Sequence, residues 1–251
     1  MAPKPWADEP FALLETPSKT MDKSSHYAIV VASEMTHSHN VLIRGLNSIY
    51  QQAPLVKNPQ DVEDLLFYCQ AWVMMVHHHH ETEEETLFPD LEEFTQKPGI
   101  MAGNQAQHNA FHDGMEKFSE YAKNTKPDEY KWDEMKAVID AFAPSLYTHL
   151  REEIQTLLDL RQYDSDGVKT VWGKTEDAAK GGKHPHLFEM IMPCVMGNVD
   201  KTYEGGIHKE FPPWPFFIPY AVHYWFARSH TGAWRFCPSD FWGNPRPLTF
   251  Q

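Results

Sequence analysis

Three separate segments of the chain each carry a pair of metal-binding side chains spaced four residues apart. Residues four apart in an α-helix lie one turn apart on the same face, so both side chains can reach one ion. A chain that uses such pairs together has to bring several helix faces around one interior, as a helical bundle does. The pairs are His80 and Glu84, His108 and His112, and His149 and Glu153.

Apolar periodicity and the positions of proline predict four helices, which cover 24–52, 58–88, 104–124 and 129–161. The second helix begins with Asn58 as N-cap and Pro59 at its first position, and Pro89 discourages its continuation. Pro144 lies inside the fourth helix and is expected to kink it. The connections between the helices are short or moderate, which favours an all-α, antiparallel up-down-up-down four-helix bundle.

The sequence divides into three parts around this bundle. Residues 1–23 are rich in proline and polar side chains and are expected to form an N-terminal arm, and the bundle occupies 24–162. Residues 163–251 are rich in Gly, Pro and aromatic residues, and we expect an irregular C-terminal extension packed on the bundle. Its aromatic rings have two interpretations: a clamp buried against the bundle, or a lid or substrate pocket near one bundle end.

Composition excludes several classes of partner. The net charge of -13 argues against binding to nucleic acid or to an anionic membrane. No run of about 18 apolar residues is present, and the N-terminal residues lack the apolar stretch of a signal peptide, so we expect a cytoplasmic protein without a membrane span. Cys69, Cys194 and Cys237 are widely spaced and are expected to be buried free thiols. Nothing in the sequence predicts an oligomeric state.

A further histidine, His39, lies in the first helix, so each of the four helices can contribute to one site. A single His/Glu pair on a helix is usually a solvated ion pair, but one set on every helix, in order, favours a metal centre. Two carboxylates can bridge a pair of ions and five imidazoles can cap them, a mixed N/O donor set that suits iron and, less selectively, manganese or zinc. The predicted ligands are His39, His80, Glu84, His108, His112, His149 and Glu153. His77 and Glu81 have the same spacing in the second helix and remain alternatives.

Four local motifs resemble the hemerythrin HHE cation-binding domain over roughly residues 24–162. They are HNVLIRGLNSIY at 39–50, HHHHETEEETLFP at 77–89, QHNAFHDGM at 107–115 and HLREEIQTLL at 149–158. The resemblance implies a di-iron centre, and the ending ExxLFP selects His80 and Glu84 in the second helix. The aromatic extension, with TYEGGIH at 202–208, is similar to hemerythrin-like proteins of filamentous fungi. Oxygen-carrying hemerythrins place the last carboxylate five residues after its histidine, whereas Glu153 follows His149 by four, so reversible oxygen carriage does not carry over.

Two functions are compatible with such a centre. In the first, a di-iron oxidoreductase binds and activates dioxygen and oxidises a small apolar organic substrate held beneath the aromatic extension. In the second, a non-catalytic protein binds iron or oxygen for storage, sensing or buffering. A bulky extension beside the centre favours the enzyme, because an oxygen carrier has no need of one.

Overall fold

The computed structural model describes residues 7–181 and 184–251, so the first six residues of the predicted arm lie outside the described part. The chain is built of helices, which confirms the all-α prediction. The α-helices are α1 (Tyr27–Gln52), α2 (Pro59–Thr82), α3 (Phe88–Thr95), α4 (Ala102–Asn124), α5 (Trp132–Leu158), α6 (Ser165–Gly181), α7 (Met192–Asn198) and α8 (Ile218–Tyr224). Two π-helical turns, η3 (Glu83–Leu87) and η5 (Leu187–Ile191), precede α3 and α7.

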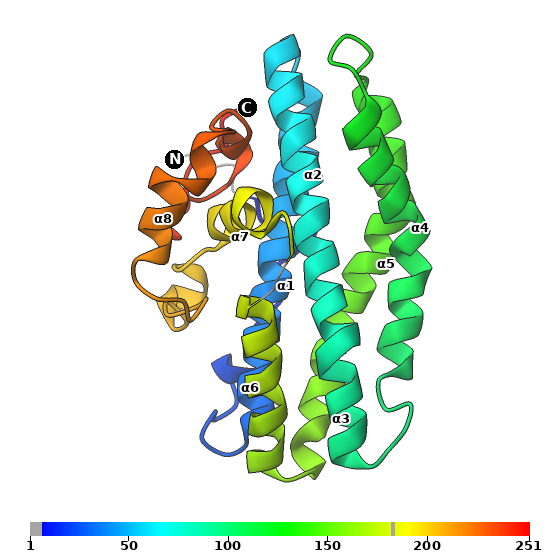
Figure 1. Cartoon of the computed structure of the whole chain (residues 1–251), viewed down its shortest axis with the longest axis vertical. Coiled ribbons are helices and arrows are strands. Elements are labelled where there is room, and N and C mark those ends of the chain that lie inside the picture. The colour runs from blue at the N-terminus through cyan, green and yellow to red at the C-terminus, as the bar shows by residue number, and fades with distance from the viewer. Residues whose placement is uncertain (1–6, 182–183) are drawn as a thin grey trace.

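Helices α1, α2, α4 and α5 form an antiparallel four-helix bundle, with α3 continuing the line of α2 (Figure 1). Side-chain caps fix where the first two helices begin: the Ala28 amide donates to His26 Nδ1 at 3.1 Å and the Gln60 amide donates to Asn58 Oδ1 at 2.9 Å. The core between the helices is apolar. The fully buried Trp72 packs in this core against one aromatic ring of α4 and one of α5. Burial of such large side chains is the main source of stability for a bundle of this kind.

The second helix differs from the prediction at its C-terminal end. It was expected to stop at Phe88, but the chain passes through the π turn η3 and continues as α3 to Thr95. Pro89 falls in the first turn of α3, where a missing backbone N–H is tolerated. Gln96, with a left-handed φ of 54°, ends the helix. Pro144 lies inside α5, which is helical without a break from Trp132 to Leu158.

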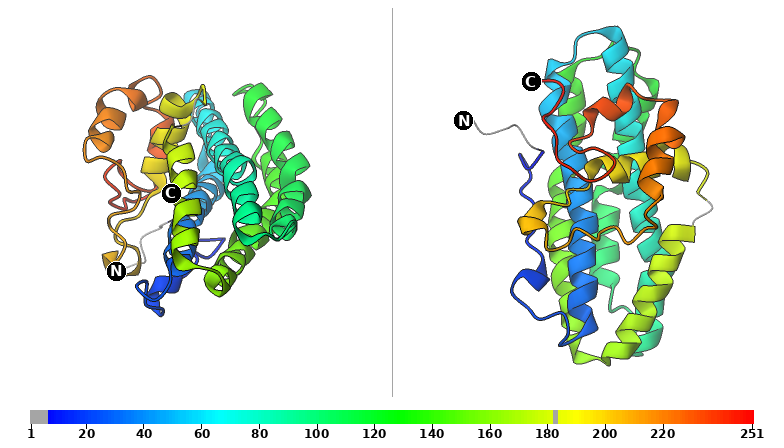
Figure 2. Two further views of the ribbon diagram at one scale, coloured as in Figure 1. Left: turned by 60° about the horizontal axis from the view of Figure 1, so that its bottom comes forward. Right: turned by 90° about the vertical axis from the view of Figure 1, so that its left-hand side faces the viewer.

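The C-terminal extension is more regular than expected. Helix α6 packs against α1, η3 and α3, whereas the sequence predicted irregular structure there (Figure 2). Its buried residues follow a helical spacing of three and four, at Val168, Val171, Trp172 and Thr175. The close contact with α3 needs a glycine, since a Cβ on Gly167 would lie 2.0 Å from Phe94 Cε2.

The rest of the extension and the N-terminal arm lie on the α1 side of the bundle (Figure 2). Asn40 and Asn47 hold the arm, because their side-chain oxygens accept from the amides of Leu14 at 2.8 Å and Phe11 at 2.9 Å. The buried Arg44 joins arm, bundle and extension: its Nη1 lies 3.1 Å from Asp8 Oδ1 and 3.1 Å from Asp200 Oδ2.

The aromatic rings of the extension have mixed positions. Trp234 and Phe236 are buried against the bundle, as a clamp would be. Phe216, Phe217, Tyr220, Tyr224 and Trp225 are exposed. The three cysteines are buried free thiols, as predicted. Across the described residues, no helix has the length and apolar character needed to span a bilayer.

Candidate metal centre

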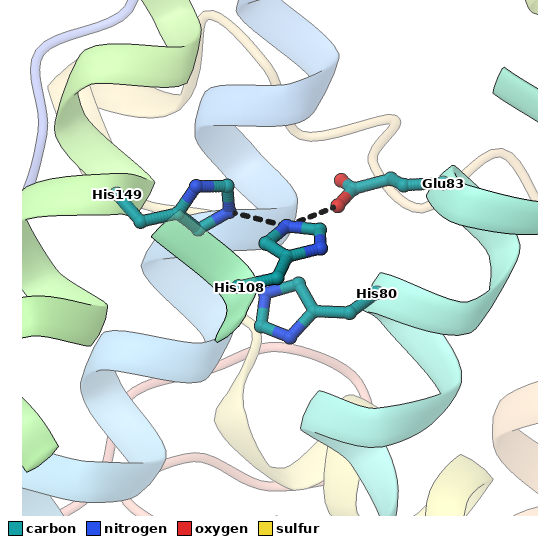
Figure 3. Close-up of side chains that lie close together, drawn as sticks. All are labelled: His80, Glu83, His108 and His149. Atoms are coloured by element: carbon teal, nitrogen blue, oxygen red, sulfur yellow. Dashed lines mark hydrogen bonds and ion pairs between the residues drawn. The ribbon is translucent and has the colours of Figure 1, made fainter. Parts of the chain in front are cut away.

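Histidine and glutamate side chains from four helices converge inside the bundle in two adjoining groups. The first group is His80, Glu83, His108 and His149, and the second group is His39, His79, Glu83 and Glu153. In each group, one donor atom from every residue lies within 4.8 Å of the others. Figure 3 shows the first group, in which the three imidazoles and the carboxylate point toward one another from α2, η3, α4 and α5.

The two carboxylates lie between the groups. Glu83 Oε1 is 3.0 Å from His79 Nε2, and Glu83 Oε2 is 3.5 Å from His108 Nε2. Glu153 Oε2 is 3.2 Å from His39 Nε2 and 3.8 Å from His149 Nε2. Each carboxylate therefore faces imidazoles of both groups, which is the placement that bridging two ions requires.

Three imidazoles are oriented by hydrogen bonds on the side away from the groups. The acceptors for the Nδ1 atoms are Leu150 O for His39 at 2.6 Å, Glu84 Oε1 for His108 at 2.6 Å and Gln107 Oε1 for His149 at 3.2 Å. An Nδ1–H that donates outward fixes the tautomer and leaves Nε2 with a free lone pair toward the interior. Histidines that bind metals are held in this way.

Burial controls the charge of the site. Burial lowers the pKa of His79, His80 and His149, so these imidazoles are neutral, the form that binds a metal. Burial, together with the neighbouring Glu153 carboxylate, raises the pKa of Glu83 well above its usual range. A bound cation would reverse that effect, because its charge favours ionised carboxylates.

Unpaired polar atoms show that the donor set fits metal ions. In the described part of the chain, the buried Nε2 atoms of His39, His79 and His80 and both oxygens of Glu83 and of Glu153 make no hydrogen bond. Buried polar atoms are seldom left unpaired, since each one costs free energy. Imidazole nitrogens and carboxylate oxygens gathered at this spacing are the donors that iron, manganese and zinc accept.

Five of the seven predicted ligands lie in these groups: His39, His80, His108, His149 and Glu153. The other two, His112 and Glu84, lie outside both groups. The His112 side chain is 61% exposed and lies beside Asp113, outside the bundle interior. Glu84 contacts the site only through the hydrogen bond from His108.

Neither of the alternatives belongs to the groups. His77 pairs with Glu116 at 3.1 Å on the outer side of α2 and α4, and Glu81 is exposed. The positions that complete the set are His79 and Glu83, which the prediction missed. The totals of five imidazoles and two carboxylates are unchanged, but the fifth imidazole comes from α2 rather than α4.

The missed residues follow apolar stripes that are visible in the sequence. On α4 the buried positions are Asn104, His108, Phe111, Met115, Phe118 and Ala122, and His112 falls beside this stripe. On α2 the steps of three and four from Cys69 lead through Trp72, Val76 and His80 to Glu83 and Leu87. The π turn, which departs from 100° per residue, begins at Glu83, and π turns are frequent at functional sites.

Together, the antiparallel bundle and the paired His/Glu groups define an α-helical metal-binding protein with its centre in the bundle core. Comparison with known families makes this more specific. Residues 30–160 match the hemerythrin HHE cation binding domain, and the chain belongs to this family.

A curated relative covers almost the whole chain. The "Dimeric xanthone biosynthesis cluster protein R11" of Cryptosporiopsis sp. (strain 8999) is 48% identical over 255 residues, which span 99% of this chain and 94% of that protein. The similarity therefore includes the extension as well as the bundle. No solved structure matches the chain significantly.

Proposed function

We propose that this chain is a di-iron protein that uses dioxygen to oxidise a small, largely apolar organic substrate. Iron held by the two groups would supply the electrons that reduce dioxygen and the oxidising power for the substrate. The chain's own residues hold the ions, keep water away from them and place the substrate beside them. Five imidazoles and two carboxylates, placed where the carboxylates would contact both ions, are a donor set suited to iron in preference to softer metals.

The observation that carries the proposal is a cavity of about 180 Å³ beside the second group. His79 and Glu83 form part of its wall. The His79 side chain is 17% exposed, whereas those of His39 and Glu153 are fully buried, so His79 is the ligand candidate that lies nearest to solvent among these three. A site that only stores iron has no need of an apolar chamber at its ligands.

The walls of the cavity come from the bundle and from the extension. Helices α1 and α2 form one side, and α6, η5, α7 and residues 211–214 form the other. Of the aromatic rings in the extension beyond α7, Phe211 and Trp214 line it, together with Pro212 and Pro213. This lining supports a substrate pocket that the extension helps to form, although α6 supplies more of the wall than the aromatic tail does.

The similarity to a protein named for a biosynthesis cluster supports a small-molecule substrate. That protein's name refers to dimeric xanthones. A cavity of about 180 Å³ is comparable with those that bind a single small aromatic molecule. The pocket therefore suits one ring system, not a whole dimeric product.

The test combines metal content with the reversibility of oxygen uptake. Protein from iron-supplemented cells is analysed for iron, reduced without air, exposed to dioxygen, and then placed under vacuum. We expect close to two iron ions per chain and irreversible oxygen consumption. Dioxygen that is released again unchanged would instead support the non-catalytic binding protein, and iron-free protein would contradict both functions.

A further inference from the structure

The cavity beside the second group also carries information about its ligand. Its lining is mostly apolar and contains several side chains that favour aromatic rings. These are the thioethers of Met35 and Met75 and the rings of Trp172, Phe211 and Trp214. Thioether sulfurs and aromatic rings contact an aromatic ligand more favourably than an aliphatic one of the same size.

Most polar groups of the lining already have partners. The hydroxyls of Ser38, Thr82 and Thr175 donate to carbonyls of their own helices. Glu176 and Lys180 pair with each other at 3.4 Å, at the more exposed end of the cavity. These groups add little affinity for a ligand, because binding would have to break an existing interaction.

Apart from His79 and Glu83 of the metal centre, Glu34 is the exception. Trp172 Nε1 donates to Glu34 Oε2 at 2.6 Å, which fixes the position of the carboxyl group. Among the described residues, its other oxygen, Oε1, has no hydrogen-bond partner. Burial raises the pKa of Glu34, as expected for a carboxyl group with limited access to water. Glu34 Oε1 is therefore a hydrogen-bond acceptor that is fixed in position within a mostly apolar cavity.

The position of Glu34 on α1 relates it to the metal centre. It lies five residues before His39, or about 7.5 Å along the helix axis. His79 of α2 and Glu83 of η3 line the same cavity. A flat ligand anchored at Glu34 would have room to extend its ring toward these two residues.

We infer that the cavity binds a neutral aromatic compound carrying a hydroxyl group, whose O–H donates to Glu34 while its ring lies between the bundle and the extension. An anion is disfavoured by the carboxylates of Glu34, Glu83 and Glu176 in the lining. A cation is disfavoured because the lining is mostly apolar and would not replace the water that hydrates its charge. The inference deepens the proposed function and rests on it only for the direction in which the ring points.

Binding can be measured without turnover, using 2-naphthol and naphthalene as probes. The metal-loaded protein is kept without dioxygen at about pH 8, where a carboxyl group is ionised, and dissociation constants are measured by fluorescence titration. We expect 2-naphthol to bind about tenfold more tightly than naphthalene, the size of one hydrogen bond to a charged acceptor. We expect Glu34→Leu to remove this difference and to leave naphthalene binding unchanged.

Two controls separate the inference from a folding defect. Glu34→Gln keeps an acceptor for Trp172 and turns its NH₂ toward the cavity, so it should favour 2-methoxynaphthalene, which can only accept, relative to 2-naphthol. Ala179→Trp, at the exposed rim on α6, should block all three probes. The inference is overturned if Glu34→Leu leaves the preference for 2-naphthol intact, or if Ala179→Trp leaves binding intact. Either result would leave the metal centre and its oxygen chemistry untouched.

Discussion

His108 and His149 face each other with their Nε2 atoms 3.0 Å apart. Each imidazole has an acceptor at its Nδ1 atom, Glu84 for His108 and the Gln107 amide oxygen for His149. Gln107 is oriented by its own donation to Glu152 at 2.7 Å. With both Nδ1–H groups donating outward, both Nε2 atoms carry lone pairs that repel each other. A cation held by both nitrogens would remove the repulsion.

Two histidine substitutions should distinguish a residue of the metal centre from a residue on the outer surface. His80→Ala removes a buried imidazole of the first group, so we expect iron content to fall to about half or less and thermal stability to decrease. His112→Ala changes an exposed side chain and should retain both iron and stability. Iron analysis and thermal unfolding measure both effects. Loss of iron in His112→Ala with full retention in His80→Ala would reverse the assignment.

The adjacent acids Glu83 and Glu84 give a second matched pair. Glu83→Gln replaces the carboxylate that faces both groups, and we expect the loss of at least one ion. Glu84→Gln keeps an acceptor for His108 Nδ1 but removes its charge. Metal affinity should therefore fall by about 10-fold, the lower end of the range for changing a residue that orients a metal ligand. Competition with a chelator measures both affinities. Equal losses in the two variants would mean that Glu84 is itself a ligand.

Metal removal should destabilise the fold. His39, Glu83 and Glu153 have buried atoms that make no hydrogen bond, and bound ions would satisfy them. At a free metal concentration of about 100 times Kd, binding adds about 2.7 kcal/mol, or roughly 5–10 °C in Tm for a chain of this size. Calorimetry before and after dialysis against a chelator measures the difference. Identical Tm values would show that the centre contributes nothing to folding.

Arg44 should matter for the attachment of the arm and the extension. Its side chain is almost fully buried, with Asp8 and Asp200 both within 3.1 Å. Arg44→Met leaves these acids without their partner, and we expect a loss of about 3 kcal/mol. Arg151→Met, on an exposed side chain of α5, is the control and should change stability by less than about 0.5 kcal/mol. Urea denaturation gives both values, and equal midpoints would contradict the role of Arg44.

The sequence was sufficient for the bundle, because its helices carry long apolar stripes, N-caps and proline boundaries. It was not sufficient for α6, where Gly167 and Gly173 lower helix propensity and few apolar residues mark the face that packs on α1. A helix of that kind is stabilised by its neighbours, and these cannot be deduced from its own residues.

For the candidate site, the sequence predicted the numbers of imidazoles and carboxylates but only some of the residues that supply them. Spacing alone cannot choose between adjacent histidines in the run His77–His80, because the choice depends on how α2 is rotated in the bundle. The rotation follows from the stripe through Trp72 and Val76, which leads to Glu83. Likewise, Phe111 and Met115 occupy the inner face of α4 and leave His112 outside.

Anomalous diffraction from crystals of the iron-loaded protein tests the central claim most directly. The structure predicts two peaks at the iron edge, one among His80, His108 and His149 and the other beside His39 and His79, with Glu83 and Glu153 between them. A single peak, or one at His112 with Glu83 unliganded, would contradict the two-group centre.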